Sequence, residues 1–253
     1  MKIAVLMKDV PDLVEDLEVE DGALPLDEMS FVPSEWDDQA LEEALLIKEE
    51  DGADVTAVAV DTGDVDTMLY TALAKGVDRA VKIVGDFSRS LTNRQRAQLL
   101  ARYCQNERFD LILTGVQAID DLDGQIAGLV AGLMGIGHAS VVRDVHVAQD
   151  RVRFVQEYSG GKMAEFDLAC PALLGIQAAR KPPRYVTIAK VRQVQKSAEI
   201  DEVEDSVGET PVVTVRRLYK PESGGHAEMW GDDVETVANH IVAILEEKKL
   251  LRG

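Results

Sequence analysis

Short apolar runs alternate with helix-like segments through the first half of this 253-residue chain. The runs are apolar almost throughout rather than at every second residue, which is typical of strands buried on both faces. Strands of this kind form parallel sheets covered by helices, with right-handed crossovers. The pattern therefore predicts an α/β fold with a doubly wound, mostly parallel sheet. Strands and helices are expected in turn at residues 2–7, 37–50, 55–60, 64–75, 80–84, 93–107 and 111–113.

The pattern changes after residue 138, where strand-like runs follow one another with only tight turns between them. They predict an antiparallel extension that returns to the sheet. A possible edge strand at residues 211–219 and a terminal helix at 234–250 follow. We therefore divide the chain into an α/β domain, residues 1–190, and an extended arm with a C-terminal helix, residues 191–253. The expected runs are 140–148, 152–158, 163–168 and 172–176.

Composition excludes two classes of partner. A formal charge of −19 argues against nucleic acid, because binding phosphates requires a positive surface. No apolar run approaches 18 residues, so no membrane span is expected. The N-terminus enters a strand at once, without a signal-peptide pattern. Cys104 and Cys170 stand in apolar settings, as free thiols do in a reducing compartment, so we expect a cytoplasmic protein.

Two neighbouring stretches carry opposite charge. Residues 180–196 contain Lys and Arg but no acid, and residues 199–209 contain Asp and Glu but no base. Adjacent blocks of opposite sign are consistent with an exposed arm that docks a partner. Two ordinary solvated stretches explain the same pattern equally well.

A candidate binding loop follows the run at residues 111–113. Gly115 permits a sharp bend, three aspartates (Asp120, Asp121, Asp123) follow, and an Ala- and Gly-rich helix begins after Gly124. A strand–loop–helix of this kind presents free backbone N–H groups at the carboxyl edge of a sheet, where α/β proteins bind nucleotides. The spacing matches neither the Rossmann fingerprint nor the P-loop, and an ordinary turn remains the alternative.

A second group of candidate residues lies at the start of the helix expected at residues 37–50. Ser34 or Asp37 can cap this helix, and Trp36 is either a staple against the helix or an apolar lid over a planar ligand. The aspartates of the 115–126 loop either cap the next helix or bind Mg²⁺, of which we favour capping. The four histidines are scattered, so no metal site is expected. No pattern of nucleophile and base is present, and we expect no catalytic residues.

A set of motifs occurs in order along the chain, at residues 7–12, 37–44, 72–80, 115–121, 160–161 and 183–187. Together these motifs resemble those of the β subunit of electron transfer flavoproteins. Residues 35–38 and 215–221 are most similar to bacterial members that serve methylamine-type dehydrogenases. The resemblance implies an adenine-nucleotide α-hydrolase-like fold, an FAD-bearing α subunit as heterodimer partner, and a C-terminal arm packed on that subunit.

The resemblance also implies a structural AMP in the β subunit. Gly124 and Ile126 stand where many AMP-binding relatives have an amide and a hydroxyl. Bifurcating relatives hold a second FAD there and also lack the hydroxyl. Their Asp-Gly-Asp-Thr motif, however, is absent from this sequence. We therefore favour AMP, with a second FAD as the alternative. Matching positions are Leu6, Ser34, Glu35, Trp36, Asp37, Val60, Gly115, Gln117, Asp121, Asp123, Gly124, Gln125 and Ile126.

Electron transfer implies docking surfaces as well. Ile188 matches an apolar anchor for a partner dehydrogenase, with steering charges at Arg184, Lys190 and Arg192. Glu157 matches a carboxylate that pairs with an α-subunit arginine. Leu13 stands where relatives often place a tyrosine beside the α-subunit FAD. Electrons would pass from the dehydrogenase through that FAD to a quinone reductase. The rivals are a nucleotide-hydrolysing enzyme and a stand-alone nucleotide sensor of the same fold.

Overall fold

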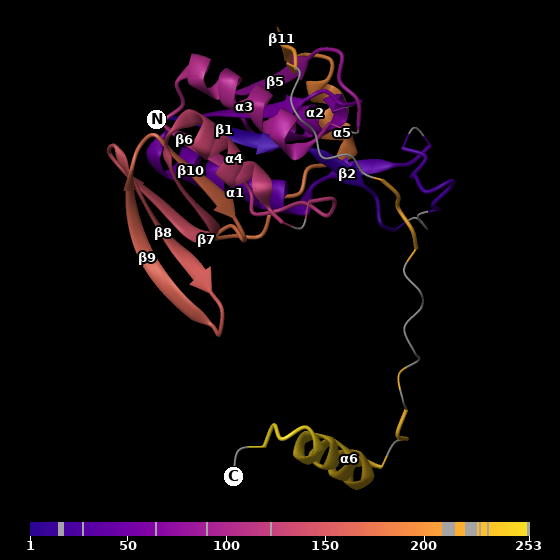
Figure 1. Cartoon of the computed structure of the whole chain (residues 1–253). Helices are drawn as coiled ribbons and strands as arrows, with labels where there is room; N and C mark the ends of the chain where they lie inside the picture. The colour runs from indigo at the N-terminus through magenta and orange to yellow at the C-terminus, as the bar shows by residue number, and fades with distance from the viewer. Residues whose placement is uncertain are drawn as a thin grey trace.

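A computed structural model describes most of the chain. The described residues are 1–14, 18–26, 28–63, 65–89, 91–121, 123–208, 216–220, 227, 229–231 and 233–251. They form an α/β body, from which a hairpin and a C-terminal helix project (Figure 1).

The body is built on a nine-stranded sheet with the order β11-β5-β4-β1-β6-β10-β7-β8-β9. Pairing is parallel from β11 to β7 and antiparallel from β7 to β9. This confirms the predicted doubly wound α/β fold. The strands are β1 (Lys2–Met7), β4 (Asp54–Val60), β5 (Arg79–Val84), β6 (Leu111–Gly115), β7 (Gly137–Ala148), β8 (Arg151–Tyr158), β9 (Lys162–Ala169), β10 (Ala172–Ile176) and β11 (Asp201–Glu204). A separate two-stranded sheet pairs β2 (Asp9–Pro11) with β3 (Phe31–Pro33).

Helices cover both faces of the sheet because successive side chains of each buried strand point to opposite sides. Ile3 and Val5 of β1 belong to one core cluster, which includes residues of α1 (Glu35–Asp51) and α2 (Asp66–Lys75). Ala4 and Leu6 belong to the other cluster, with α3 (Asn93–Glu107) and α4 (Gln125–Met134). The near-continuous apolar runs in the sequence are thus explained by two cores that share one sheet.

The sheet differs from the prediction at two places. β10 does not continue the antiparallel extension but enters between β6 and β7 and runs parallel to both. The acidic stretch after residue 199 forms β11, which pairs with β5 and completes the edge of the sheet. The domain boundary expected at residue 190 therefore falls inside α5 (Ile188–Val194), and the body extends at least to Glu204.

The C-terminal arm carries α6 (Val234–Glu247), which lies apart from the body and has no buried residue (Figure 1). The edge strand expected at 211–219 lies outside the described residues as far as 215, and residues 216–220 form no regular element. Asp233 caps α6 by accepting a hydrogen bond from Thr236 N at 2.9 Å. Within the described ranges, no helix has the length and hydrophobicity to cross a bilayer.

Candidate functional site

A pocket lies at the carboxyl ends of β1 and β6, where open α/β sheets bind ligands. Its walls come from the end of β1, the first turn of α1, the loop between β6 and α4, and one face of α3. The lining residues are Leu6, Met7, Lys8, Asp37, Arg96, Leu100, Thr114, Gly115, Val116, Gln117, Ala118, Asp121, Gly124 and Ile126.

Asp37 ties three of these elements together. One carboxylate oxygen accepts a hydrogen bond from Gly115 N, and the other accepts one from Lys8 N, both at 2.9 Å. The side chain is buried, and desolvation raises the pKa of Asp37 from 3.8 to about 7 despite these two hydrogen bonds. Asp37 therefore binds the ends of β1 and β6 and does not cap its own helix, which was one of the two alternatives. Ser34 occupies the cap position, but its hydroxyl is buried and has no partner among the described residues.

Two glycines allow the loop to approach closely. A Cβ atom on Gly115 would lie 2.7 Å from the Asp37 carboxylate and equally close to Trp36. A Cβ atom on Gly124 would lie 2.4 Å from the carbonyl oxygen of Val116, and this residue has a φ of 62°. Because only glycine fits both positions, the loop holds its backbone against the pocket.

The aspartates of the loop have separate roles. Gly124 occupies the cap position of α4 and has no side chain to cap it, and the Asp121 carboxylate accepts a hydrogen bond from the first N–H of this helix, Gln125 N, at 3.2 Å. Asp120 instead forms an ion pair with Lys8 at 2.6 Å, and Asp123 is exposed. No cluster of metal-ligating side chains occurs in the part of the chain that the structure describes.

Arg96 is a pocket residue that the sequence analysis did not identify. It lies on α3 and is only 6% exposed, and its Nε and Nη1 atoms have no hydrogen-bond partner among the residues described. Burial lowers the pKa of Arg96, while the charges of Asp9, Asp120 and Asp37 oppose this shift. The sequence does contain a signal for its burial. Arg96 stands four residues before Leu100, so helical periodicity places it on the buried stripe of α3.

The expected nucleotide-site residues fall into three groups. Ser34, Glu35 and Trp36 line a neighbouring pocket together with Leu13. Val60 is buried in the sheet, and Asp123 and Gln125 are exposed. The remaining expected residues line the first pocket: Leu6, Asp37, Gly115, Gln117, Asp121, Gly124 and Ile126.

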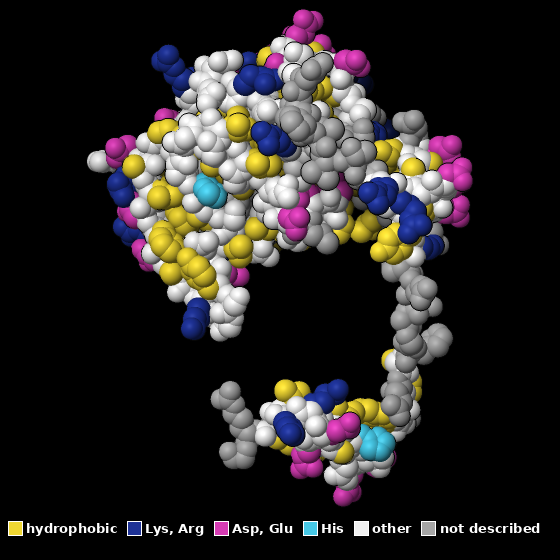
Figure 2. Space-filling view, in the orientation of Figure 1, with side chains coloured by type: hydrophobic (Ala, Val, Ile, Leu, Met, Phe, Trp, Pro, Cys, Tyr) yellow, Lys and Arg dark blue, Asp and Glu magenta, His cyan; other side chains and the backbone are white. Residues whose placement is uncertain are grey.

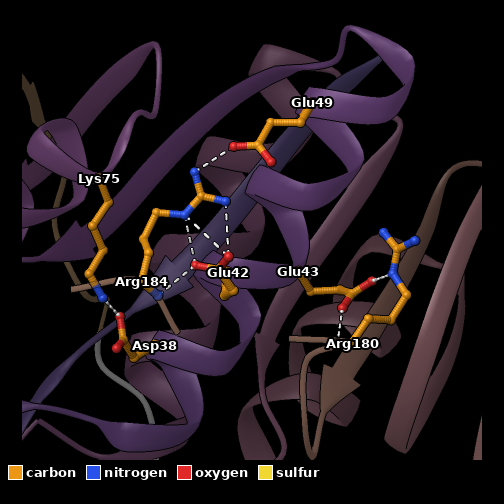
Figure 3. Close-up of polar contacts among 7 residues, drawn as sticks. All are labelled: Asp38, Glu42, Glu43, Glu49, Lys75, Arg180 and Arg184. Carbon is orange, nitrogen blue, oxygen red and sulfur yellow. Dashed lines mark hydrogen bonds and ion pairs between the residues drawn. The ribbon is translucent and has the colours of Figure 1, made fainter. Parts of the chain in front are cut away.

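The segment before α5 is fastened to α1 by two arginines (Figure 3). Arg184 forms an ion pair with Glu42 at 2.9 Å and with Glu49 at 2.6 Å. Arg180 does the same with Glu43 at 2.7 Å and with Glu50 at the same distance. Arg184 was expected to steer a partner, but its charge is taken up by two carboxylates of its own chain.

The other expected docking residues lie on the surface. Ile188 is the first residue of α5 and is 67% exposed, with Lys190 and Arg192 exposed on the same short helix. Glu157 on β8 forms an ion pair with Arg143 of β7 at 2.8 Å, so a partner's arginine would compete with Arg143 for this carboxylate. Leu13 is about half exposed beside Trp36 in the neighbouring pocket.

Comparison with known proteins gives the same family as the motifs. A model of the electron transfer flavoprotein domain matches residues 26–208. The electron transfer flavoprotein subunit beta of Methylophilus methylotrophus is 33% identical, over 98% of this chain and 99% of the relative. The subunit beta of Bacillus subtilis is 27% identical over 99% and 100%. The caffeyl-CoA reductase-Etf complex subunit CarD of Acetobacterium woodii is 26% identical over 99% and 100%.

These matches confirm the predicted resemblance. The chain belongs to the electron transfer flavoprotein family. Within it, the chain aligns from end to end with proteins named as β subunits, a designation that implies an α partner.

Proposed function

We propose that this chain is the β subunit of a heterodimeric electron transfer flavoprotein in the cytoplasm, without catalytic residues of its own. It binds a structural AMP in the pocket at the ends of β1 and β6. It supports an α subunit that carries FAD, and it docks a flavin-containing dehydrogenase whose electrons pass toward a quinone oxidoreductase. The end-to-end similarity to β subunits carries this proposal.

The pocket supports a bound nucleotide. Gly115 and Gly124 bring the loop backbone up to the cavity at the start of α4, where N–H groups and the helix dipole favour an anion. The buried guanidinium of Arg96 fits the same charge. An AMP that binds only the folded chain would stabilise it by mass action.

Exposed apolar surfaces support an α-subunit partner. Tyr158, Met163 and Phe166 on β8 and β9 are between 39% and 60% exposed. Figure 2 shows hydrophobic side chains gathered over this hairpin and again along α6. A contiguous apolar surface of this kind on a protein of net charge −19 marks a protein interface. The amphipathic helix α6, with Ile241 and Ile244 partly exposed, has no apolar surface of the body to cover it.

The surface around α5 supports a transient docking site. Ile188 projects from a segment that the Arg180 and Arg184 ion pairs hold in place, so an exposed apolar anchor stands on a fixed base. Lys190 and Arg192 surround it with positive charge, which speeds encounter with an acidic partner. One anchor with a charged rim gives specificity without a slow off-rate.

A second FAD in place of AMP is the competing assignment. CarD, a subunit named for a caffeyl-CoA reductase-Etf complex, aligns with the whole chain. Mass spectrometry of the ligand released from denatured protein separates the two. Co-expression with the α subunit should give a yellow 1:1 complex that releases one AMP and one FAD. Release of two FAD and no AMP would show that the pocket holds a second FAD. Purification of a stable colourless monomer would contradict the heterodimer.

The docking site is tested with Ile188→Ala in the same complex. We expect KM for the complex as electron acceptor to rise at least about fivefold with flavin content unchanged, because the variant loses a central apolar anchor. Leu133→Ala is the matched control, since Leu133 is also exposed, at 48%, but lies on α4. Equal effects of the two variants, or loss of flavin in Ile188→Ala alone, would contradict the docking role.

A further inference from the structure

Arg96 is a buried cation whose Nε and Nη1 atoms have no partner among the described residues. Its side chain faces the pocket, and two of its nitrogen atoms are shielded from water yet donate no hydrogen bond within the described part of the chain. An unsatisfied buried donor is destabilising, and more so when it is charged. The contrast with Arg180 and Arg184 is informative, because those partly buried arginines each bind two carboxylates.

Three carboxylates lie near enough for their charges to act on Arg96, but each of them already binds another group. Asp9 pairs with Arg89 at 2.8 Å, and Asp120 pairs with Lys8 at 2.6 Å. Both oxygens of Asp37 accept backbone hydrogen bonds. These groups act on Arg96 through space, but none accepts a hydrogen bond from it among the contacts of the described residues. The guanidinium is therefore available to a group that enters the pocket.

The rest of the pocket offers few side-chain donors to an anion. Gly124 and Ile126 have none, and the charge of Lys8 is neutralised by Asp120. Beside the loop backbone and the neutral side chains of Thr114 and Gln117, the lining offers Arg96 on α3, whose Nε and Nη1 have no partner among the described residues. The two free atoms, Nε and Nη1, lie on different edges of the guanidinium plane, and each can donate a charge-assisted hydrogen bond to a phosphate oxygen.

We propose that Arg96 receives the phosphate of the pocket's ligand through charge-assisted hydrogen bonds from its guanidinium and sets the preference of the site for phosphorylated nucleosides. The inference rests on the proposed nucleotide site and adds the residue that reads the anionic group. A guanidinium holds several donors at fixed positions in one plane, so lysine at this position keeps the charge but loses those fixed donors.

The test uses the α–β complex after removal of its nucleotide, in four forms: wild type, Arg96→Gln, Arg96→Lys and Arg94→Gln. Arg94 is exposed on the same helix and serves as the control. Binding of AMP and of adenosine is measured by calorimetry, and flavin content reports folding. We expect Arg96→Gln to weaken AMP at least tenfold while adenosine affinity changes less than twofold. Arg96→Lys should weaken AMP by a smaller factor, and Arg94→Gln should match wild type.

Other outcomes have distinct meanings. Equal AMP affinity in wild type and Arg96→Gln overturns the inference but leaves the nucleotide site in place. Equal weakening of AMP and adenosine also overturns it, because Arg96 would then only shape the pocket. Inorganic phosphate is the second probe: it should raise the melting temperature of wild type but not of Arg96→Gln. If wild type responds to phosphate and not to AMP, the AMP assignment fails while the role of Arg96 stands.

Discussion

Replacing Arg180 with methionine tests how the docking segment is held. The side chain of Glu43 on α1 is fully buried, and it accepts hydrogen bonds from Arg180 N at 2.8 Å and Arg180 Nε at 2.7 Å. Methionine fills much of the same volume but leaves a buried carboxylate without its cation. Removing one partner of a buried ion pair costs about 3–5 kcal/mol, whereas the exposed pair with Glu50 contributes at most about 1 kcal/mol. We therefore expect a loss of about 3–5 kcal/mol, nearly all of it from Glu43.

The assay is urea unfolding of the purified protein at pH 7, followed by circular dichroism. Glu50→Gln should change the free energy of unfolding by less than about 1 kcal/mol. In the double variant Arg180→Met with Glu43→Gln, no buried charge remains unpaired, and the glutamine oxygen still accepts a hydrogen bond from the backbone N–H of residue 180. The double variant should therefore be more stable than the sum of the single losses by about 2 kcal/mol or more. A loss below 1 kcal/mol in Arg180→Met, or additive losses in the double variant, would refute the reasoning.

Two further predictions concern the pocket. Because burial raises the pKa of Asp37 to about 7, its stabilising contribution is complete below pH 3.8 and is lost as pH rises through 7. The unfolding free energy of nucleotide-free wild type relative to Asp37→Asn should therefore fall by about 2 kcal/mol between pH 5 and 7, and a constant difference would contradict this. Gly115→Ala should cost at least about 2 kcal/mol, because its Cβ would meet Asp37 and the Trp36 backbone at 2.7 Å. Gly132→Ala on α4 has open space around its Cβ position and should stabilise the protein by roughly 0.5–1 kcal/mol, and urea unfolding measures both glycine variants.

The sheet could be predicted from sequence because its strands are buried on both sides. Residues such as Ile3 to Leu6 have to face one core or the other, so an apolar run leaves few alternatives. The same logic fails at β11, whose acidic residues look solvated until the bases of β5 are placed beside them. Arg79 binds Asp201, and Lys82 lies 3.2 Å from Glu202. Pairing across more than 100 residues leaves no local signal.

From its residue pattern alone, the sequence indicated the pocket at the loop between β6 and α4 and at the start of α1, and the family resemblance implied its other expected residues. Gly115 and Gly124 mark a turn and a close approach, which sequence reveals directly. Arg96 belongs to a helix that appeared ordinary, and its role depends on what α3 packs against. Likewise, Arg184 looked like a free surface charge because its partner Glu42 lies 142 residues earlier in the chain. Predictions about side-chain charge fail when the opposing charge comes from another element.

β11 is synthesised long after β5, the strand with which it pairs, and this delay has a consequence for the growing chain. The 122 residues between Arg79 and Asp201 take roughly 6–24 s to translate at about 5–20 residues per second, so the outer edge of β5 stays open for that time. Open strand edges invite pairing with other chains, and charged side chains deter it. We therefore expect Arg79 and Lys82 to deter such pairing on the nascent sheet, before the same two cations receive the carboxylates of β11.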